Sequence, residues 1–482
     1  MIPVTLGEIA TIVGGALVGD PDVTVTDGVE FDSRAVVPGG LFVAFAGEKV
    51  DGHDFAADAV AAGAVGALAA RPLPDLPTVV VPDATAALGR LASAVLARLP
   101  ELTVIGLTAS SGKTTTKDYL AQLLAELGPT VAPPGSFNNE LGHPYTVCKA
   151  TERTRYLVLE LGARGIGHIR QLCGIAPPTV GVVLNVGDAH VGEFGSIEAT
   201  ARAKGELVEA LPADGLAVLN SDDPRVRAMA GRTAAATVLV GEAADADIRA
   251  VNVRMDDRGR ATYTLVAAEG RAPVRLAVAG SHQVGNTLAA AAVALRLGYP
   301  LARLGPALGR LRQLSGRRMD VFDRPDGVTV IDDSYNANPS SMAAALHALV
   351  AVAGGRRTVA VLGYMAELGE AETAGHREVG RLAAAEGVAE LVVVGDLARA
   401  IYDGASGLSG WAGRARLVAD QAEAVAALRE LLTPGDVVLV KGSRYRTWTV
   451  ADDLRDSANE TGPATAARPP ARPASAGERT AL

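Results

Sequence analysis

TVIGLTASSGKTTTKD, at residues 103–118, is the stretch that decides the fold. Its apolar beginning predicts a buried strand over 103–107, and its end predicts a helix over roughly 113–127. A glycine- and serine-rich loop between a strand and a helix is typical of phosphate-binding loops, because backbone N–H groups and the helix N-terminus both attract anions. The stretch therefore predicts an α/β domain that binds a nucleotide.

The residues of this loop have distinct expected roles. The backbone N–H groups from 109 to 114 should face the β- and γ-phosphates, Lys113 should add a positive charge, and a hydroxyl of Thr114 or Thr115 can reach a magnesium ion. The two loop glycines are separated by five residues, which departs from a regular Walker A loop and disfavours ordinary GTPases and transport ATPases. The alternative is a glycine-rich turn with a surface lysine. The predicted nucleotide-binding residues of the loop are Ala109, Ser110, Ser111, Gly112, Lys113, Thr114 and Thr115.

The sequence around the loop predicts a doubly wound, mostly parallel sheet. Continuous apolar runs at 155–161, 179–186 and 215–220 are typical of strands buried on both faces. Residues 249–279 alternate polar and apolar side chains instead, which predicts an antiparallel addition to that sheet. We assign this central P-loop domain to residues 85–313.

Two further α/β domains flank the central one in the prediction. Residues 1–84 contain short helix and strand patterns typical of a small α/β domain, and 314–456 alternate apolar strands with helix-length segments, typical of a Rossmann-like domain. Residues 457–482 contain four prolines and almost no large apolar side chain, so we expect a disordered tail. The predicted fold class is therefore α/β with three domains.

Composition limits the classes of function. The chain has 482 residues, 49% of them apolar, and a formal net charge of −9 without a basic cluster, which argues against nucleic-acid binding. The first basic residue is Arg34, so a signal peptide is not expected, and no apolar stretch reaches the ~18 residues of a membrane span. Cys148 and Cys173 form no metal-binding pair and are expected in a core or as free thiols. These features predict a cytoplasmic protein without membrane insertion.

Three polar residues in the central domain each allow two interpretations. Glu160 ends an apolar strand, where α/β sheets bind their ligands, but it could instead cap a helix. His190 follows another such strand, yet histidine is an unusual magnesium ligand, so by itself it predicts a surface loop residue. Lys204 by itself predicts a solvated residue on a helix.

Other polar pairs are equally ambiguous. Asn138 and Asn139 could orient a carboxylate or phosphate, or could form a turn. His282 and Asn286 are four residues apart and share one face at the start of a helix, where they could bind a ligand or cap the helix.

A later segment should lie close to the nucleotide. Asp333 ends a predicted strand, and Asn338 with Pro339 predicts a helix start. Asp333, Tyr335 and Asn336 would then face the nucleotide across a domain cleft.

These segments resemble, in order and spacing over about residues 25–450, the motifs of the Mur ligase family. Each fragment is weak by itself, but the ordered set is specific. Ala109 stands where the family usually has glycine, and Tyr364 where aspartate is common, which leaves the contacts to the second substrate open. The matching segments are FDSR (31–34), SFNNELGHP (136–144), ELGARGIGHI (160–169), NVGDAHVGEFGS (185–196), ARAKGEL (201–207), GSHQVGNTLAA (280–290), GRRMD (316–320), IDDSYNANPSSM (331–342), GYMAELG (363–369) and VKGSR (440–444).

The resemblance implies cofactors and roles for single residues. It implies ATP and two Mg²⁺ ions, with Thr114, Glu160, His190 and Lys204 as metal ligands, and Lys204 carrying a CO₂-derived carbamate. Lys113, Lys204, His190 and Arg317 are the implied catalytic residues, and Arg317 would reach the phosphates from the third domain. His282, Asn286, Asp333, Tyr335 and Asn336 would surround the nucleotide, and the implied substrate-binding residues are Asp32, Ser33, Arg34, Gly47, His53, Asn138, Asn139, Lys441 and Arg444.

The resemblance also implies an activity. IDDSYNANPSSM is most similar to the family branch that joins D-alanyl-D-alanine to a UDP-muramoyl tripeptide through an acyl phosphate, in peptidoglycan synthesis. The expected partners are therefore small-molecule substrates, and a monomer is expected. A sibling ligase that adds a different amino acid, and a P-loop ATPase or switch that performs no ligation, are the alternatives.

Overall fold

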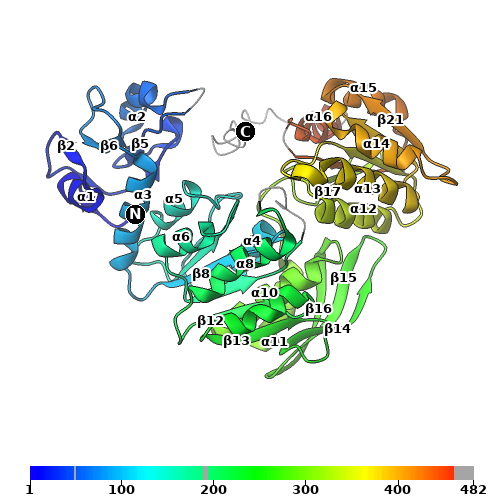
Figure 1. Ribbon diagram of the computed structural model, residues 1–482, viewed down its shortest axis with the longest axis horizontal. Coiled ribbons are helices and arrows are strands. Elements are labelled where there is room, and N and C mark those ends of the chain that lie inside the picture. Colours follow the sequence, from blue (N-terminus) through cyan, green and yellow to red (C-terminus); the bar gives the residue numbers. More distant parts are fainter. Residues whose placement is uncertain (48–49, 188–193, 444, 461–482) are drawn as a thin grey trace.

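The computed structural model describes residues 1–47, 50–187, 194–443 and 445–460. Figure 1 shows three α/β parts in chain order: an N-terminal part in blue, a central part in cyan and green, and a C-terminal part in yellow to red. Within the described residues, no helix is long and apolar enough to cross a membrane. The predicted class, α/β with three domains, is confirmed.

The N-terminal part is built on a five-stranded sheet of order β2-β7-β6-β5-β4, parallel except for β2. Thr5 caps α1, since its hydroxyl accepts from the N–H of Glu8 at 3.2 Å and its own N–H donates to the Glu8 carboxylate at 2.9 Å. The elements are β1 (Val4–Thr5), α1 (Leu6–Val13), β2 (Ala16–Val18), β3 (Thr24–Val25), β4 (Val29–Glu30), η1 (Ser33–Ala35), β5 (Leu41–Val43), η2 (Gly52–Phe55), α2 (Ala56–Ala62), β6 (Gly66–Ala69) and β7 (Thr78–Val80).

The central part has a nine-stranded sheet of order β16-β15-β14-β13-β12-β11-β8-β10-β9. Strand β15 pairs antiparallel with both β14 and β16, whereas the other neighbouring strands of this sheet pair parallel, which confirms the antiparallel addition predicted over 249–279. The elements are α3 (Ala84–Ala97), β8 (Thr103–Thr108), α4 (Lys113–Ala125), β9 (Thr130–Val131), α5 (Gly142–Val147), β10 (Tyr156–Glu160), α6 (His168–Ile175), β11 (Val180–Val183), α8 (Ile197–Glu209), β12 (Leu216–Asn220), α9 (Pro224–Arg227), η3 (Ala228–Arg232), β13 (Ala236–Gly241), β14 (Ile248–Met255), β15 (Arg260–Ala267), β16 (Gly270–Ala279), α10 (Gln283–Arg296) and α11 (Leu301–Arg310).

The continuous apolar strands are explained by a core on each face of this sheet. Along β10, Leu157 and Leu159 enter one core while Val158 enters the other, because successive side chains of a strand point to opposite faces. The first of these cores continues into the N-terminal part through α3, whose Leu88 and Leu91 are fully buried. Helix α3 therefore joins the two parts.

The C-terminal part has a six-stranded sheet of order β17-β18-β22-β19-β20-β21, parallel except for β17. Asn338 caps α12 and Pro339 is its first residue, as predicted. Helix α16 continues to Glu460, so the tail boundary expected at 457 falls inside a helix; residues 461–482 lie outside the described part. The elements are β17 (Asp320–Asp323), β18 (Thr329–Asp332), α12 (Pro339–Ala353), β19 (Thr358–Leu362), η4 (Gly369–Ala371), α13 (Glu372–Ala385), β20 (Glu390–Val394), η5 (Asp396–Ala398), α14 (Arg399–Ser406), β21 (Arg414–Val418), α15 (Gln421–Leu431), β22 (Val437–Lys441) and α16 (Trp448–Glu460).

Candidate active site

The phosphate loop connects β8 to α4 in the predicted way. Gly112 has φ +82°, and a Cβ there would lie 2.6 Å from Oδ1 of Asn286, so both the backbone and the neighbouring side chain require glycine. Lys113 is the first residue of α4, and its ammonium donates to the carbonyl of Ala109 at 2.6 Å. Burial lowers the pKa of Lys113, while Glu160 raises it and Arg318 lowers it further. Lys113 is thus not the surface lysine of the alternative interpretation.

Asn185, two residues after the end of β11, fixes the conformation of the phosphate loop by hydrogen bonds. Its Oδ1 accepts from the N–H groups of Ser110 at 3.1 Å and Ser111 at 2.9 Å, and its Nδ2 donates to the Ser111 carbonyl at 3.0 Å. These two amides are therefore bonded within the protein, which differs from the expectation that every amide from 109 to 114 faces phosphate. Asn185 was not among the predicted site residues, although it lies within a motif quoted for the resemblance.

Glu160 lies beside the start of α4 and is 1% exposed. Its carboxylate accepts from the hydroxyls of Thr114 at 2.8 Å and Ser136 at 2.9 Å, and from the Asn138 amide at 2.8 Å. The N-terminus of α6 is capped instead by Glu206, which accepts from the N–H of Gly167 at 2.6 Å. The helix-cap interpretation of Glu160 is therefore wrong.

This carboxylate fits a magnesium ion. A buried carboxylate with adjacent hydroxyl oxygens provides the hard oxygen ligands that Mg²⁺ prefers, with room left for water or substrate oxygens. Among the described residues, no group of three or more His, Cys, Asp or Glu side chains could hold a metal ion. Ser136 joins Glu160 and Thr114 without having been predicted, because its loop shows no periodicity that would place it.

Lys204 lies on α8 and is 2% exposed, so the interpretation as a solvated helix residue is wrong. Burial lowers its pKa well below the usual value, and the charge of Lys113 lowers it further. Arg232 fixes this helix by donating to the carbonyls of Ala201 at 3.2 Å and Arg202 at 2.8 Å. Burial beside the phosphate loop therefore disfavours the ammonium form of Lys204. His190 lies outside the described residues.

Two neighbouring arginines of the third part point in different directions. Arg317 pairs with Asp452 at 3.0 Å, so it is directed to α16 and not to the phosphates as predicted. Arg318 lies 4.0 Å over the Tyr335 ring and is close enough to Lys113 to lower its pKa. The positive φ of Arg317, +62°, turns the backbone between the two side chains. No sequence signal separates two adjacent arginines, so Arg318 was missed.

Polar residues from the second and third parts meet near the loop. Lys441 is 2% exposed and lies 2.5 Å from Asp333, and it also donates to the Asn336 carbonyl at 2.9 Å. Desolvation lowers the pKa of His282, Asp333 raises it and Lys441 lowers it, which places these groups together. Lys441 was expected to bind substrate, but its ammonium is buried against Asp333, which lies at the end of the neighbouring strand. Arg444 lies outside the described residues.

The residues of the N-terminal part that were predicted to bind the substrate contact their own neighbours in the chain. Asp32 pairs with Arg34 at 2.7 Å and caps η1, which begins at the buried Ser33. His53 is 5% exposed, and its Nε2 accepts from the N–H of Ala70 at 3.1 Å. A Cβ on Gly47 would lie 2.7 Å from the Val50 carbonyl, so this loop needs glycine there. His53 therefore supports the loop, and its buried ring differs from the expected substrate contact.

An aromatic contact brings the first part against the second. Phe31 precedes Asp32, and its ring centroid lies 6.1 Å from that of Phe137 and 5.1 Å from that of Tyr145. Asn138 follows Phe137 and reaches Glu160, whereas Asn139 forms a turn by accepting from the N–H of Gly142 at 2.9 Å. Asn138 thus has the predicted ligand-side position, and Asn139 has the turn role.

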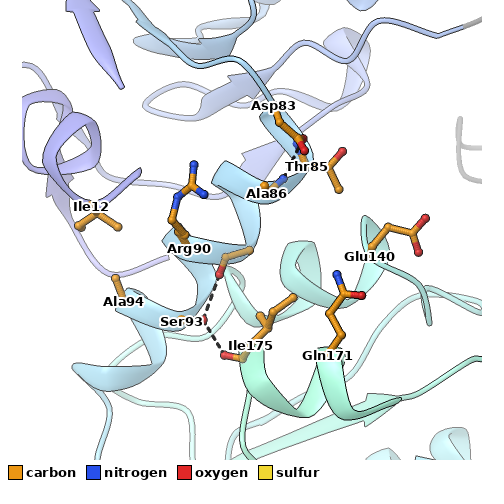
Figure 2. Close-up of a pocket in the computed structure, with 11 residues that line it drawn as sticks. Ile12, Asp83, Thr85, Ala86, Arg90, Ser93, Ala94, Glu140, Gln171 and Ile175 are labelled. Carbon is orange, nitrogen blue, oxygen red and sulfur yellow. Dashed lines mark hydrogen bonds between the residues drawn. The ribbon is translucent and has the colours of Figure 1, made fainter. Parts of the chain in front are cut away.

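A hollow of about 660 Å³ lies away from these residues, between α1, α3 and α6. Figure 2 shows Ile12 and Arg90 on one side of it and Gln171 on the other, with Ser93 donating to the carbonyl of Ile175 at 2.9 Å. None of the predicted site residues lines it. It belongs to the packing of α3 against its neighbours.

Comparisons with known proteins agree with this arrangement. Family models match at residues 26–95 (Mur ligase family, catalytic domain), 107–294 (Mur ligase middle domain) and 317–444 (Mur ligase, glutamate ligase domain). UDP-N-acetylmuramoyl-tripeptide–D-alanyl-D-alanine ligase of Mycobacterium tuberculosis (strain ATCC 25618 / H37Rv) is 50% identical over 92% of this chain and 96% of its own length. The Escherichia coli (strain K12) enzyme of the same name is 37% identical over 92% and 96%.

Solved structures give the same result. MurF from Acinetobacter baumannii superposes with a TM-score of 0.84 at 32% identity, covering 95% of this chain and 99% of that one. MurF ligase from Thermotoga maritima, solved in complex with ADP, has a TM-score of 0.77 at 30% identity, covering 92% and 100%. With half of its residues identical to a named relative over nearly the whole length, this chain belongs to the Mur ligase family.

Proposed function

We propose that this chain is an ATP-dependent ligase of peptidoglycan precursor synthesis that joins D-alanyl-D-alanine to UDP-N-acetylmuramoyl tripeptide and releases ADP and phosphate. The observation that carries this proposal is 50% identity, over 92% of the chain, to a ligase named for that reaction. The group of Lys113 and the buried Thr114 and Glu160 beside the phosphate loop supports it chemically.

The first chemical step transfers a phosphoryl group to the tripeptide carboxylate, which brings like charges together. Lys113 and Arg318 provide the positive charge that offsets this repulsion, and the N-terminus of α4 adds its dipole. Magnesium, when bound, neutralises phosphate and carboxylate oxygens. Thr114 and Glu160 would hold one ion, and His190 with a carbamate on Lys204 the other.

The carbamate needs a neutral amine. The neutral Lys204 nitrogen attacks the carbon of CO₂, an N–H proton leaves to solvent, and an anionic carbamate with two oxygens replaces the amine. Burial favours the neutral amine that attacks CO₂, because it disfavours the ammonium form. The product is an oxygen ligand of the kind that Mg²⁺ prefers.

The second step is attack of the dipeptide amine on the acyl phosphate, through a tetrahedral intermediate. Residues 314–456 would close over the nucleotide, with His282 and Asn286 on one side and Asp333, Tyr335 and Asn336 on the other. Residues 1–84, including Asp32 to Arg34, would hold the UDP portion. Because one chain supplies every assigned residue, we propose that the protein acts as a monomer. We propose that it works in the cytoplasm, because ATP is available there.

The test is phosphate release with UDP-muramoyl tripeptide against a panel of amino acids and D,D-dipeptides. Release should require both the precursor and D-alanyl-D-alanine. Stimulation by one amino acid alone would assign the chain to a sibling ligase, and phosphate release without any precursor would assign it to the P-loop ATPases that perform no ligation.

A further inference from the structure

The linker between the second and third parts lies along the helix that follows the phosphate loop. Thr115, Asp118 and Gln122 are spaced to share one face of α4, and each contacts the linker 312–315. The contacts are Gln313 Nε2 to Thr115 Oγ1 at 2.7 Å, the N–H groups of Leu314 and Ser315 to Asp118 Oδ2 at 3.1 and 2.8 Å, Arg312 N–H to Gln122 Oε1 at 3.1 Å, and Gln122 Nε2 to the Arg312 carbonyl at 2.7 Å.

A buried ion pair lies at the end of this contact. Lys117 is 2% exposed and Asp118 is 1% exposed, and the ammonium lies 2.5 Å from Asp118 Oδ1. The same ammonium donates to the Pro133 carbonyl at 2.9 Å and to the Ser315 hydroxyl at 3.2 Å. Buried pairs give little net stability because both charges lose hydration, so this one is better explained by the geometry that it fixes.

Beyond Ser315 the chain is bound to the third part instead. The carbonyl of Arg317 accepts from the N–H of Tyr335 at 3.1 Å, and the N–H of Met319 donates to Asp333 at 3.1 Å. Gly316 alone separates the two anchored segments, and a Cβ there would meet nothing within 4 Å. Gly316 is therefore the junction between the two anchored segments, several residues after the end of α11 at Arg310, and we call this junction the pivot.

We propose that Lys117 and Asp118 are positioning residues that fix this pivot on α4 and thereby hold Arg318 at the phosphates. The inference rests on the proposed function, since it assigns Arg318 to the transferred phosphoryl group. Arg318 lies two residues beyond the pivot, with its guanidinium over Tyr335 and near Lys113. The helix that begins at the phosphate loop thus also sets where the third part turns.

The test measures domain placement and catalysis in the full chain. Labels are attached to Ala268→Cys and Ala374→Cys, two exposed positions on the second and third parts, because the native Cys148 and Cys173 are buried. In the double variant Lys117→Met/Asp118→Asn, the distance distribution with an ATP analogue should broaden. Its kcat should fall by about tenfold to a hundredfold, as expected for a catalytic group displaced by about 1 Å, while KM for ATP changes less than about threefold.

Glu126→Gln is the matched control. Glu126 caps the other end of α4 and pairs with Arg303 at 3.2 Å and Arg310 at 3.1 Å, without touching the linker 312–315. The Glu126→Gln variant should leave both the distance distribution and kcat unchanged.

Wild-type kcat with a wild-type distance distribution in the double variant would overturn the proposal. Should that variant fail to fold, Ser315→Ala removes only the hydroxyl contacts and should shift both readouts in the same direction by a smaller amount; unchanged readouts in folded Ser315→Ala would overturn it equally. The distance measurement needs no turnover, so its result is independent of which acceptor the wild-type enzyme uses.

Discussion

Buried charged side chains near the carboxyl ends of the two large sheets differ in whether they form a salt bridge. In the third part, Lys441 and Asp333 lie 2.5 Å apart and neutralise each other. In the central part, Glu160 accepts only from hydroxyl and amide groups, and Lys204 has no ion-pair partner among the described residues. Burying an unpaired charge is costly, so it persists where a ligand completes the site. In this comparison, the carboxylate and the lysine without a salt bridge among the described residues are the ones that lie beside the phosphate loop.

The largest effect should come from the unpaired lysine. Lys204→Ala should lower kcat by about 10³-fold, because the second metal loses an oxygen ligand. Short carboxylic acids such as acetate should restore part of this activity by occupying the space of the carbamate. Independently of turnover, ¹³C-labelled bicarbonate should give a carbamate NMR signal in the wild type that is missing in the variant; full activity of Lys204→Ala would reject the carbamate.

Neutralising Asp333 should mainly lower stability, whereas neutralising Glu160 should mainly lower activity. Asp333→Asn should destabilise the fold by about 3 kcal/mol, since it leaves Lys441 buried without its counter-charge. Glu160→Gln should change stability by less than about 1 kcal/mol but lower kcat by about 10²-fold. Chemical denaturation and steady-state kinetics measure both quantities. Lys441→Met/Asp333→Asn is the matched control and should recover most of the lost stability; equal destabilisation by both single variants would remove the distinction.

A third buried group tests whether burial without an ion-pair partner among the described residues is enough to mark a site. His143 on α5 is 0% exposed, and burial lowers its pKa to about 4. The pKa of His143 in the folded protein lies below its unfolded value of about 6.5. Above pH 6.5 the histidine is neutral in both states and does not change the free energy of unfolding. As the pH falls to 4, the unfolded state binds a proton first, which lowers the free energy of unfolding by up to about 3 kcal/mol.

His143→Leu should therefore flatten the fall in unfolding free energy between pH 6.5 and 4 without changing kcat at neutral pH. Denaturation curves at several pH values measure this, and the wild type is the reference. An unchanged pH dependence would show that other groups titrate there, and a lost kcat would make His143 part of the site.

The periodicity and local chemistry of the sequence were sufficient to predict the fold class and the nucleotide-binding loop. The alternation over 249–279, the cap at Asn338 and the loop before Lys113 depend on neighbours a few residues apart, so a linear pattern contains them. The fold class and the nucleotide-binding loop follow from these local rules. For Glu160 the strand pattern left two interpretations open, and the family resemblance decided between them; for Lys204 the resemblance alone indicated a role in the site.

Tertiary structure alone decided which side chains face the ligand. Arg317 and Arg318 are identical in type and adjacent, yet one pairs with Asp452 and the other lies over Tyr335. The burial of Lys204 and the bonds of Asn185 to the phosphate loop depend likewise on segments distant in sequence. Such choices are made by backbone direction and by partners that meet only when separate sheets pack, and no pattern along a single strand or helix contains that information.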